Sequence, residues 1–187
     1  MKRAIIIHGY NDEEEFLDAS RPAASNDHWI AWLQRQLLLN KIEAQAPEMP
    51  GFFQPNYESW KKMLDRFEPD SETMLIGHSC GGGFLVRWLS ESKAKVGKVV
   101  LVAPWLDPDH VIDPDFFNFE IDSNIAQKTN GLVVMYSTDD DESILKTVEI
   151  LKQTLHGAQF QEFKNKGHFV LGSLGTHEFP ELLANLI

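Results

Sequence analysis

The pentapeptide Gly-His-Ser-Cys-Gly at positions 77–81 has the spacing G-x-S-x-G, which can expose a reactive serine. Residues 73–76 before it form a short apolar run typical of a buried strand, and residues 82–89 after it begin a helical pattern. A serine on such a sharp strand-to-helix turn has its Oγ exposed, and the flanking glycines relieve crowding of the backbone. Ser79 is therefore a candidate nucleophile, and a simple helix-capping serine is the alternative.

Two later segments offer an acid and a base for this serine. Asp139, Asp140 and Asp141 directly follow one apolar run, and His168 lies just after another. Because the carboxyl ends of parallel strands meet at one edge of a sheet, we expect these side chains near the serine. A histidine within reach of a serine hydroxyl takes up its proton during attack, and an acid behind the histidine stabilises the imidazolium. Any of the three aspartates could face the histidine while the others cap the following helix.

Backbone N–H groups are expected to stabilise the oxyanion that forms when a serine attacks a carbonyl. The first donor is the N–H of Cys80, directly after the serine, and we assign the second to Tyr10, in the loop after the first strand. The thiol of Cys80 is expected to point into the sheet, with a catalytic thiol as the alternative. His8 lies on the same edge and could line the site. His78 is not expected to be the base, because adjacent side chains diverge at a turn.

Neither a metal nor a cofactor is expected. The sequence has no H-x-x-x-H motif and no Cys/His cluster. Glycines 81–83 at a helix N-terminus could hold a phosphate, but they lack the Gly-Lys-Ser/Thr of a P-loop and the G-x-G-x-x-G spacing. The remaining histidines show no pairing and are interpreted as structural or surface residues: His28, His110, His156 and His177.

Short apolar runs alternate with longer amphipathic segments along the whole chain. The expected strands are residues 4–7, 42–46, 73–76, 98–103, 132–137 and 159–163. The expected helices are residues 25–40, with Asn26 or Asp27 as the cap, 57–67, 81–92, 122–129, 142–156 and 177–186, with Pro180 in the first turn. Alternating elements with continuous apolar strands predict an α/β fold, a three-layer parallel sheet of about six strands with helices on both faces.

Length and composition fit one domain, residues 1–187, of an ordinary globular protein. The net charge of −11 argues against nucleic acid or an anionic membrane as a partner, because both bind basic patches. The acidic clusters at 12–15 and 139–142 are interpreted as solvated loops or helix N-termini. A single cysteine excludes an internal disulfide and favours a cytoplasmic location. No apolar run approaches the roughly 20 residues that span a bilayer, and the apolar run after the start is too short for a signal peptide.

With these residues in place, the chain resembles the small serine hydrolases related to retinoblastoma-binding protein 9, a compact branch of the α/β-hydrolase superfamily. The order serine, aspartate, histidine is the order of that superfamily's triads. The matching pieces run nearly end to end: the His-Gly turn at 8–9, His28-Trp29, Met49-Pro50, and residues 76–79, 100–102, 137–140 and 167–169. In the family's Ser-Thr-Asp-Asp motif the second aspartate is the acid. The resemblance therefore implies Ser79 as nucleophile, Asp140 as acid and His168 as base.

This resemblance implies a serine hydrolase that cleaves a small ester, thioester or amide through an acyl-enzyme, with an esterase favoured. The alternative is a catalytically weak protein of the same fold that acts as an interaction module. The expected partner is a small-molecule acyl substrate, and nothing in the sequence indicates an oligomeric state. An L-x-C-x-E motif, which accompanies retinoblastoma binding, is absent, because the cysteine lies in Ser-Cys-Gly. Little or no cap is expected: the aromatic residues of segment 104–124 either cover the core or form a short lid.

Overall fold

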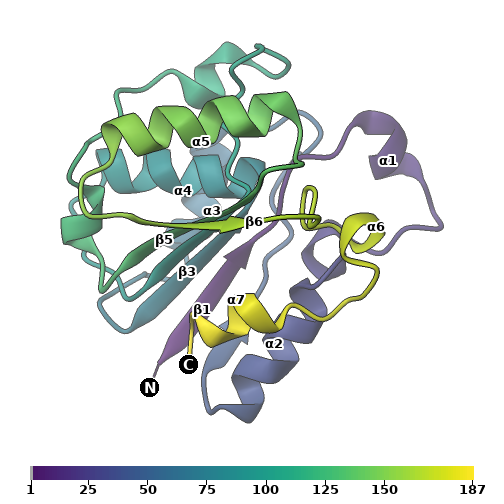
Figure 1. Ribbon diagram of the computed structural model, residues 1–187, viewed down its shortest axis with the longest axis horizontal. Helices are drawn as coiled ribbons and strands as arrows, with labels where there is room; N and C mark the ends of the chain where they lie inside the picture. Colours follow the sequence, from purple (N-terminus) through teal and green to yellow (C-terminus); the bar gives the residue numbers. More distant parts are fainter. Residues whose placement is uncertain (1) are drawn as a thin grey trace.

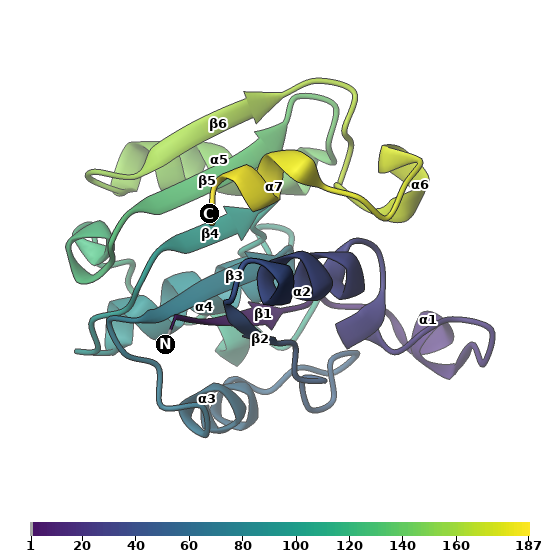
Figure 2. The same cartoon turned by 90° about the horizontal axis from the view of Figure 1, so that it is seen from below.

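A six-stranded parallel sheet forms the centre of the computed structural model, which describes residues 2–187. The strand order is β2-β1-β3-β4-β5-β6 (Figures 1 and 2). The strands are β1 (Arg3–Ile7), β2 (Glu43–Gln45), β3 (Thr73–His78), β4 (Val99–Val102), β5 (Leu132–Ser137) and β6 (Gln159–Phe163). Every residue of β3 and β5 is buried, as continuous apolar runs predict for a sheet covered on both faces. The expected parallel sheet is confirmed, with the bounds of β5 and β6 as predicted.

Helices cover both faces of this sheet. The α-helices are α1 (Glu13–Leu17), α2 (Ile30–Leu39), α3 (Tyr57–Asp65), α4 (Cys80–Glu91), α5 (Glu142–Thr154), α6 (Leu171–Leu174) and α7 (Pro180–Ala184). Single 3₁₀ turns form at Ala24–Asn26, Pro114–Phe117 and Ile125–Lys128. Helices α2 and α7 lie together on one face, while α3, α4 and α5 lie on the other (Figures 1 and 2). No helix among residues 2–187 is long and apolar enough to cross a membrane.

The first large helix begins later than its apolar spacing predicts. The expected helix over 25–40 is a 3₁₀ turn followed by α2, and its expected cap at Asn26 or Asp27 is wrong. His28 adopts a left-handed φ of 54°, which interrupts the helical path. The carboxylate of Asp27 accepts the N–H of His28 at 2.6 Å instead of capping a helix. This break turns Asp27 and His28 toward the carboxyl edge of the sheet.

Two short helices that the periodicity did not predict lie at this edge. Figure 2 shows α1 and α6 at the end of the molecule to which the strand arrows point. Helix α1 contains the first acidic cluster, and the carboxylate of Asp12 caps it by accepting the N–H of Glu15 at 2.8 Å. Its acidic first turn suits the positive end of a helix. The interpretation of residues 12–15 as a helix N-terminus is therefore confirmed.

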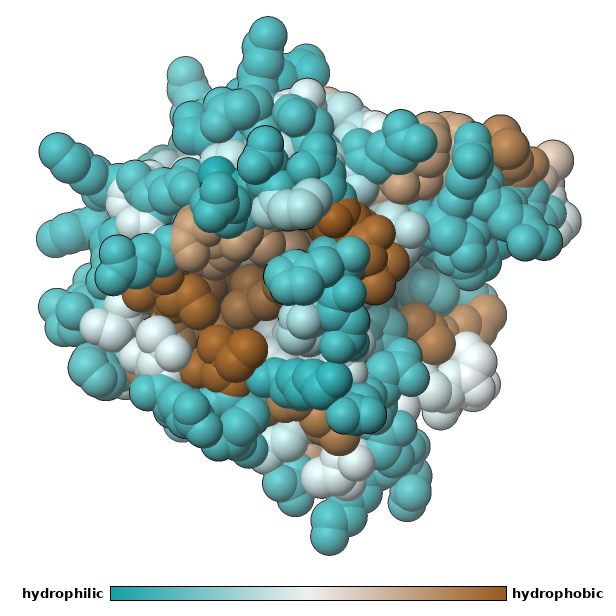
Figure 3. All heavy atoms as spheres, turned by 90° about the horizontal axis from the view of Figure 1, so that it is seen from above, coloured by the Kyte–Doolittle hydropathy of each residue, from teal (hydrophilic) through white to brown (hydrophobic). Residues whose placement is uncertain are grey.

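Segment 104–124 packs against α3 and α4, and its start also lies at the carboxyl edge of the sheet, where the ring of Trp105 is 6.0 Å from that of Tyr10. Phe116 is buried, and its ring meets the rings of Trp60 at 5.1 Å and Phe84 at 6.4 Å. The guanidinium of Arg87 donates to the carbonyl of Phe116 at 2.9 Å. These contacts favour the alternative in which the aromatic residues of this segment cover the hydrophobic core. That the segment moves as a lid stays a prediction. Seen from above, this side of the molecule surrounds a small apolar area with hydrophilic side chains (Figure 3).

Candidate active site

Ser79 occupies the single residue between β3 and α4. Its φ of 53° and ψ of −122° lie in a region that non-glycine residues rarely adopt, so the surrounding structure must hold the turn. The N–H of Ser79 donates to the carbonyl of Val102 at 2.9 Å. Its carbonyl accepts the N–H groups of Gly82 at 2.9 Å and Trp105 at 3.0 Å. Hydrogen bonds to β4, to the first turn of α4 and to the segment after β4 therefore fix the nucleophile turn.

Glycines make this turn possible because the backbone approaches itself closely there. A Cβ added at Gly77 would lie 2.6 Å from the carbonyl oxygen of Gly81. One added at Gly81 would lie 2.4 Å from the carbonyl oxygen of His8, and one at Gly83 would lie 1.9 Å from that of Trp105. All these neighbours are backbone atoms, which cannot move aside as a side chain can. The predicted relief of crowding by glycine is confirmed here.

The predicted base and acid lie in direct contact. The Nδ1 of His168 lies 3.0 Å from Oδ1 and 3.1 Å from Oδ2 of Asp140. The Asp140 side chain is 1% exposed and that of His168 is 25% exposed, so the carboxylate lies behind the ring and the ring faces the pocket. Since a carboxylate accepts, Nδ1 carries the proton and Nε2 keeps its lone pair. A free Nε2 is the form that a general base requires.

Within residues 2–187, neither neighbouring aspartate bonds the ring of His168. The carboxylate of Asp139 accepts the hydroxyl of Ser137 and, at 3.3 Å, the N–H of Gly167. The Ser137 hydroxyl lowers the pKa of Asp139, and desolvation opposes this only partly. Asp141 is exposed at the N-cap position of α5, and its side chain makes no capping hydrogen bond there. Of the three alternatives that the sequence left open, the geometry favours Asp140 as the partner of His168, while Asp139 supports the loop that carries it.

The loop after β1 lies directly beside the serine. A Cβ added at Gly9 would lie 3.1 Å from Cβ and 3.6 Å from Oγ of Ser79. The ring of His8 holds this loop: Nδ1–H donates to the carbonyl of Gly9 at 2.8 Å, while Nε2 accepts the N–H of Met49 at 2.8 Å. Burial lowers the pKa of His8, which keeps the ring neutral and able both to donate and to accept.

His8 also orients the expected oxyanion donor. In a trans peptide the C=O and the next N–H point in opposite directions, so fixing the Gly9 carbonyl fixes the N–H of Tyr10. Within residues 2–187, neither this N–H nor that of Cys80 donates to another protein group. Cys80 begins α4, where an N–H has no intrahelical acceptor. Both predicted donors are therefore unoccupied and flank the serine in sequence or in space.

The thiol of Cys80 is unsuited to act as a nucleophile. Its side chain is buried, and burial raises the pKa of the thiol well above its usual value, with Asp107 adding to the shift. A protonated thiol is a weak nucleophile. These observations favour the N–H of Cys80 over its sulfur, as the sequence predicted. No group of His, Cys, Asp and Glu side chains within residues 2–187 is arranged to hold a metal ion.

A pocket of about 230 Å³ contains Ser79 and His168. Most of its remaining wall comes from the long connection between β1 and α2. Besides Tyr10, the predicted oxyanion donor, this connection contributes residues that the sequence did not assign to the site: Asn11, Glu15, Arg21, Ala24, Asp27 and His28. The interpretation of His28 as a structural or surface residue is wrong to that extent, because its ring lines the pocket. The length of this connection was the available signal, since long loops in compact domains often carry function.

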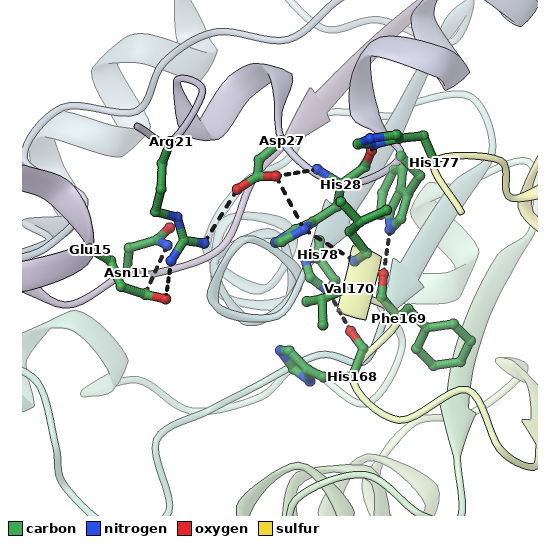
Figure 4. A network of polar contacts seen from close by, with 12 residues as sticks. Asn11, Glu15, Arg21, Asp27, His28, His78, His168, Phe169, Val170 and His177 are labelled. Carbon is green, nitrogen blue, oxygen red and sulfur yellow. Dashed lines mark hydrogen bonds and ion pairs between the residues drawn. The ribbon is translucent and has the colours of Figure 1, made fainter. Parts of the chain in front are cut away.

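A chain of polar contacts crosses this wall (Figure 4). The amide of Asn11 donates to Glu15 at 2.9 Å, and the guanidinium of Arg21 pairs with Glu15 and, at 3.4 Å, with Asp27. One cation thus stands between two carboxylates, and the ring of His28 follows, with Nδ1 3.3 Å from Asp27. Burial lowers the pKa of His28 more strongly than Asp27 raises it. The pocket therefore has a polar wall in which one cation faces two carboxylates, which leaves a net negative charge.

Comparisons with known proteins identify the family and the fold of this chain. A family model described as Serine hydrolase matches residues 4–186. YdeN of Bacillus subtilis (strain 168), which is named as a hydrolase, is 27% identical over 176 residues, covering 90% of this chain and 86% of that protein. The crystal structure of the ydeN gene product from B. subtilis matches with a TM-score of 0.80 and 26% identity, over 100% of this chain and 97% of that chain.

Two more distant structures share the fold. A ydeN-like hydrolase from Pectobacterium atrosepticum has a TM-score of 0.59 and 16% identity, over 97% of this chain and 92% of that chain. Est1E from Butyrivibrio proteoclasticus, solved with bound ferulic acid, has a TM-score of 0.64 and 12% identity, over 98% and 90%. The expected superfamily is confirmed, and the narrower resemblance to hydrolases related to retinoblastoma-binding protein 9 fits the same family. The chain belongs to the serine hydrolase family, with an α/β-hydrolase fold, and is a hydrolase.

Proposed function

We propose that this hydrolase cleaves a small ester, thioester or amide, with Ser79 as nucleophile, His168 as general base and Asp140 as the acid behind it. One observation carries the proposal: the imidazole of His168 bonds the buried Asp140 carboxylate through Nδ1 and lines the same pocket as the strained turn of Ser79. This arrangement leaves Nε2 of His168 as the group that takes up the serine proton. An ester is favoured because an alkoxide or phenolate leaves more readily than an amine.

The reaction then follows from what each group can do. Ser79 Oγ attacks the substrate carbonyl as its proton passes to Nε2 of His168, and Asp140 stabilises the imidazolium. The N–H groups of Cys80 and Tyr10 stabilise the oxyanion, and losing one such donor typically costs about 100- to 1,000-fold in rate. The imidazolium returns the proton to the leaving group, which departs from the acyl-enzyme. Water activated by the same ring then releases the acid.

The pocket favours short acyl and leaving groups. Its volume of about 230 Å³ holds a small fragment, and most of its lining side chains are polar. The aliphatic side chains in its wall are Ala24, Ile30 and Val170. A long acyl chain would extend beyond this small polar pocket into water. Each methylene that stays in water forfeits the roughly 0.8 kcal/mol that its burial would contribute to binding. We therefore expect acetyl and butyryl esters to be hydrolysed faster than octanoyl esters.

A fluorophosphonate probe tests the proposal, because it reacts only with an activated serine. Wild type should be labelled and Ser79→Ala should not be. Ser71→Ala, which changes an exposed serine at the opposite end of β3 from Ser79, should be labelled like wild type. His168→Ala should lower both labelling and the hydrolysis of p-nitrophenyl acetate by at least about 1,000-fold. Labelling that survives Ser79→Ala contradicts the assignment of the nucleophile. Equal rates for wild type and His168→Ala would instead favour the interaction-module alternative.

A further inference from the structure

His78 connects the nucleophile turn to the loop of the base, and it also forms part of the pocket lining. It ends β3, immediately before Ser79, and it is 4% exposed. Its Nε2 lies 2.9 Å from the backbone carbonyl oxygen of His168. Figure 4 shows the ring of His78 beneath the loop that carries His168, Phe169 and Val170. The residue before the nucleophile is thus bonded directly to the residue that is the proposed base.

The bond fixes the protonation of the His78 ring. A carbonyl only accepts, so Nε2 must carry the proton and donate it. The titratable groups that face this ring are histidines. The ring centroids of His168 and His28 lie 5.0 and 6.0 Å away, and His8 is more distant. Burial and these neighbours lower the pKa of His78 well below its usual value. The ring therefore stays neutral while the proposed base gains and loses its proton.

The loop that carries His168 depends on such anchors. Asn165, Gly167 and Phe169 all have left-handed φ values, of 57°, 47° and 55°. For a bulky residue such as Phe169 this conformation costs of order 1 kcal/mol or more and persists only where the surroundings hold it. Few of the loop's backbone groups lie in regular structure, because it runs between β6 and the short α6. Its shape must come from contacts with other elements.

Three side chains hold successive backbone groups of this loop. His78 donates to the carbonyl of His168, Nε1–H of Trp29 donates to the carbonyl of Phe169 at 3.0 Å, and Nδ1 of His28 accepts the N–H of Leu171 at 3.3 Å. Of these anchors, His78 alone comes from the strand that ends at the nucleophile. Asp140 fixes the orientation of the His168 ring, whereas His78 fixes the backbone from which that ring projects.

We propose that His78 is a positioning residue that sets the distance between Ser79 and His168 by tying the nucleophile turn to the base loop. This inference rests on the proposed function of those two residues. Misplacing a reacting group by about 1 Å can cost about 100-fold in rate, so a single lost anchor is sufficient to slow the reaction. Substrate binding should be little affected, because only 4% of His78 is exposed in the pocket that it helps to line.

Variants at position 78 separate this bond from simple packing. His78→Leu keeps an apolar side chain of similar size and removes the donor, while His78→Gln places an amide donor where Nε2 lies. We expect His78→Leu to lower kcat for p-nitrophenyl acetate by about 10- to 100-fold with KM within about twofold, and His78→Gln to stay within about threefold of wild type. Should His78→Leu not fold, His78→Asn, whose shorter amide cannot reach the carbonyl, replaces it with the same expectation.

A double-mutant comparison shows whether the effect acts through the base. In the His168→Ala background, His78→Leu should not lower the residual rate further, because there is no base left to position. Leu151→Ala, which removes buried side-chain volume in α5, serves as a control for general destabilisation and should lower the melting temperature without lowering kcat. A loss of kcat that is the same with and without His168 overturns the proposal. So does a His78→Gln variant as slow as His78→Leu.

Amide hydrogen exchange gives a readout that does not need activity. Exchange of the peptide covering residues 164–171 should be faster in His78→Leu than in wild type, and close to wild type in His78→Gln. Unchanged exchange in His78→Leu overturns the positioning role even if the protein proves to be an efficient hydrolase. If instead wild type is not labelled by the fluorophosphonate, the proposed function fails, and the exchange result still decides whether His78 holds the loop.

Discussion

Replacing Asp140 by asparagine should impair the reaction without altering the shape of the site. The carboxylate lies 3.0 and 3.1 Å from Nδ1 of His168 and is 1% exposed, so water screens the pair poorly. At a charge separation of about 4 Å and an effective dielectric constant of about 20, the pair stabilises the imidazolium by about 4 kcal/mol. At 1.36 kcal/mol per tenfold, this corresponds to about a 1,000-fold loss of kcat. The asparagine amide can also donate to Nδ1 and so favour the wrong tautomer, which adds to the loss.

Matched variants of the neighbouring aspartates are the controls. Asp141→Asn should stay within about twofold of wild type, because its side chain is exposed and caps nothing in α5. Asp139→Asn should lose only about two- to tenfold, because the amide can still accept the N–H of Gly167 through its oxygen. The assay is the initial rate of p-nitrophenyl acetate hydrolysis, with the rate of fluorophosphonate labelling measured beside it. The assignment of Asp140 is refuted if the rate of Asp140→Asn lies within tenfold of wild type while that of Asp139→Asn or Asp141→Asn is reduced by more than 100-fold.

Three further predictions concern the turn, the thiol and the buried histidines. Gly81→Ala should lower the free energy of unfolding by about 3 kcal/mol or more, and the melting temperature by roughly 10 °C, because its Cβ would lie 2.4 Å from a backbone oxygen. Gly172→Ala, which has open space around the added Cβ, should leave both values unchanged. The buried Cys80 thiol of the native protein should resist alkylation by iodoacetamide at pH 8, and rapid alkylation would contradict this. Cys80→Ala should keep kcat within about fivefold of wild type, because the proposed role of residue 80 uses its backbone N–H. Burial lowers the pKa values of His8 and His78, so below pH 6.5 the unfolded chain binds protons that the folded chain does not. The free energy of unfolding should therefore decrease as the pH falls, by up to about 1.4 kcal/mol per pH unit for each ring. Urea denaturation at a series of pH values measures this dependence, which should be less steep in His78→Gln than in wild type.

The sequence predicted the parts of this protein that are specified locally. The apolar runs of β3 and β5 are fully buried strands, and their pattern alone places Ser79 and the aspartates at strand ends. The order of elements along the chain then predicts one sheet edge for the serine, aspartate and histidine, because parallel strands share that edge. The sequence left open which of Asp139, Asp140 and Asp141 faces the histidine. That choice depends on the direction in which each side chain leaves a tight turn, and the pattern of residue types along the chain does not indicate this direction.

The pocket wall could not be predicted because it depends on contacts between distant segments. Glu15, Arg21 and Asp27 form their ion pairs across a connection with little regular structure, and neither spacing nor composition brings them together. The displaced start of α2 has a similar cause. The left-handed turn at His28 is stable where its ring accepts the N–H of Leu171, 143 residues later in the chain. Local propensity favours a continuous helix there, and a tertiary contact overrides it.

The histidines of this site divide into two kinds by what their ring nitrogens do. In His8 both nitrogens are bonded to backbone groups, one as donor and one as acceptor, which only the neutral ring can satisfy. His78 is likewise a buried donor to a carbonyl and would gain a costly charge on protonation. His168 differs from both, because its Nδ1 bonds a carboxylate and its ring lines the pocket. The proposed base is thus the ring backed by a carboxylate, whereas the neutral rings hold backbone on either side of it: His8 holds the loop of the expected oxyanion donor, and His78 bonds the loop of the base.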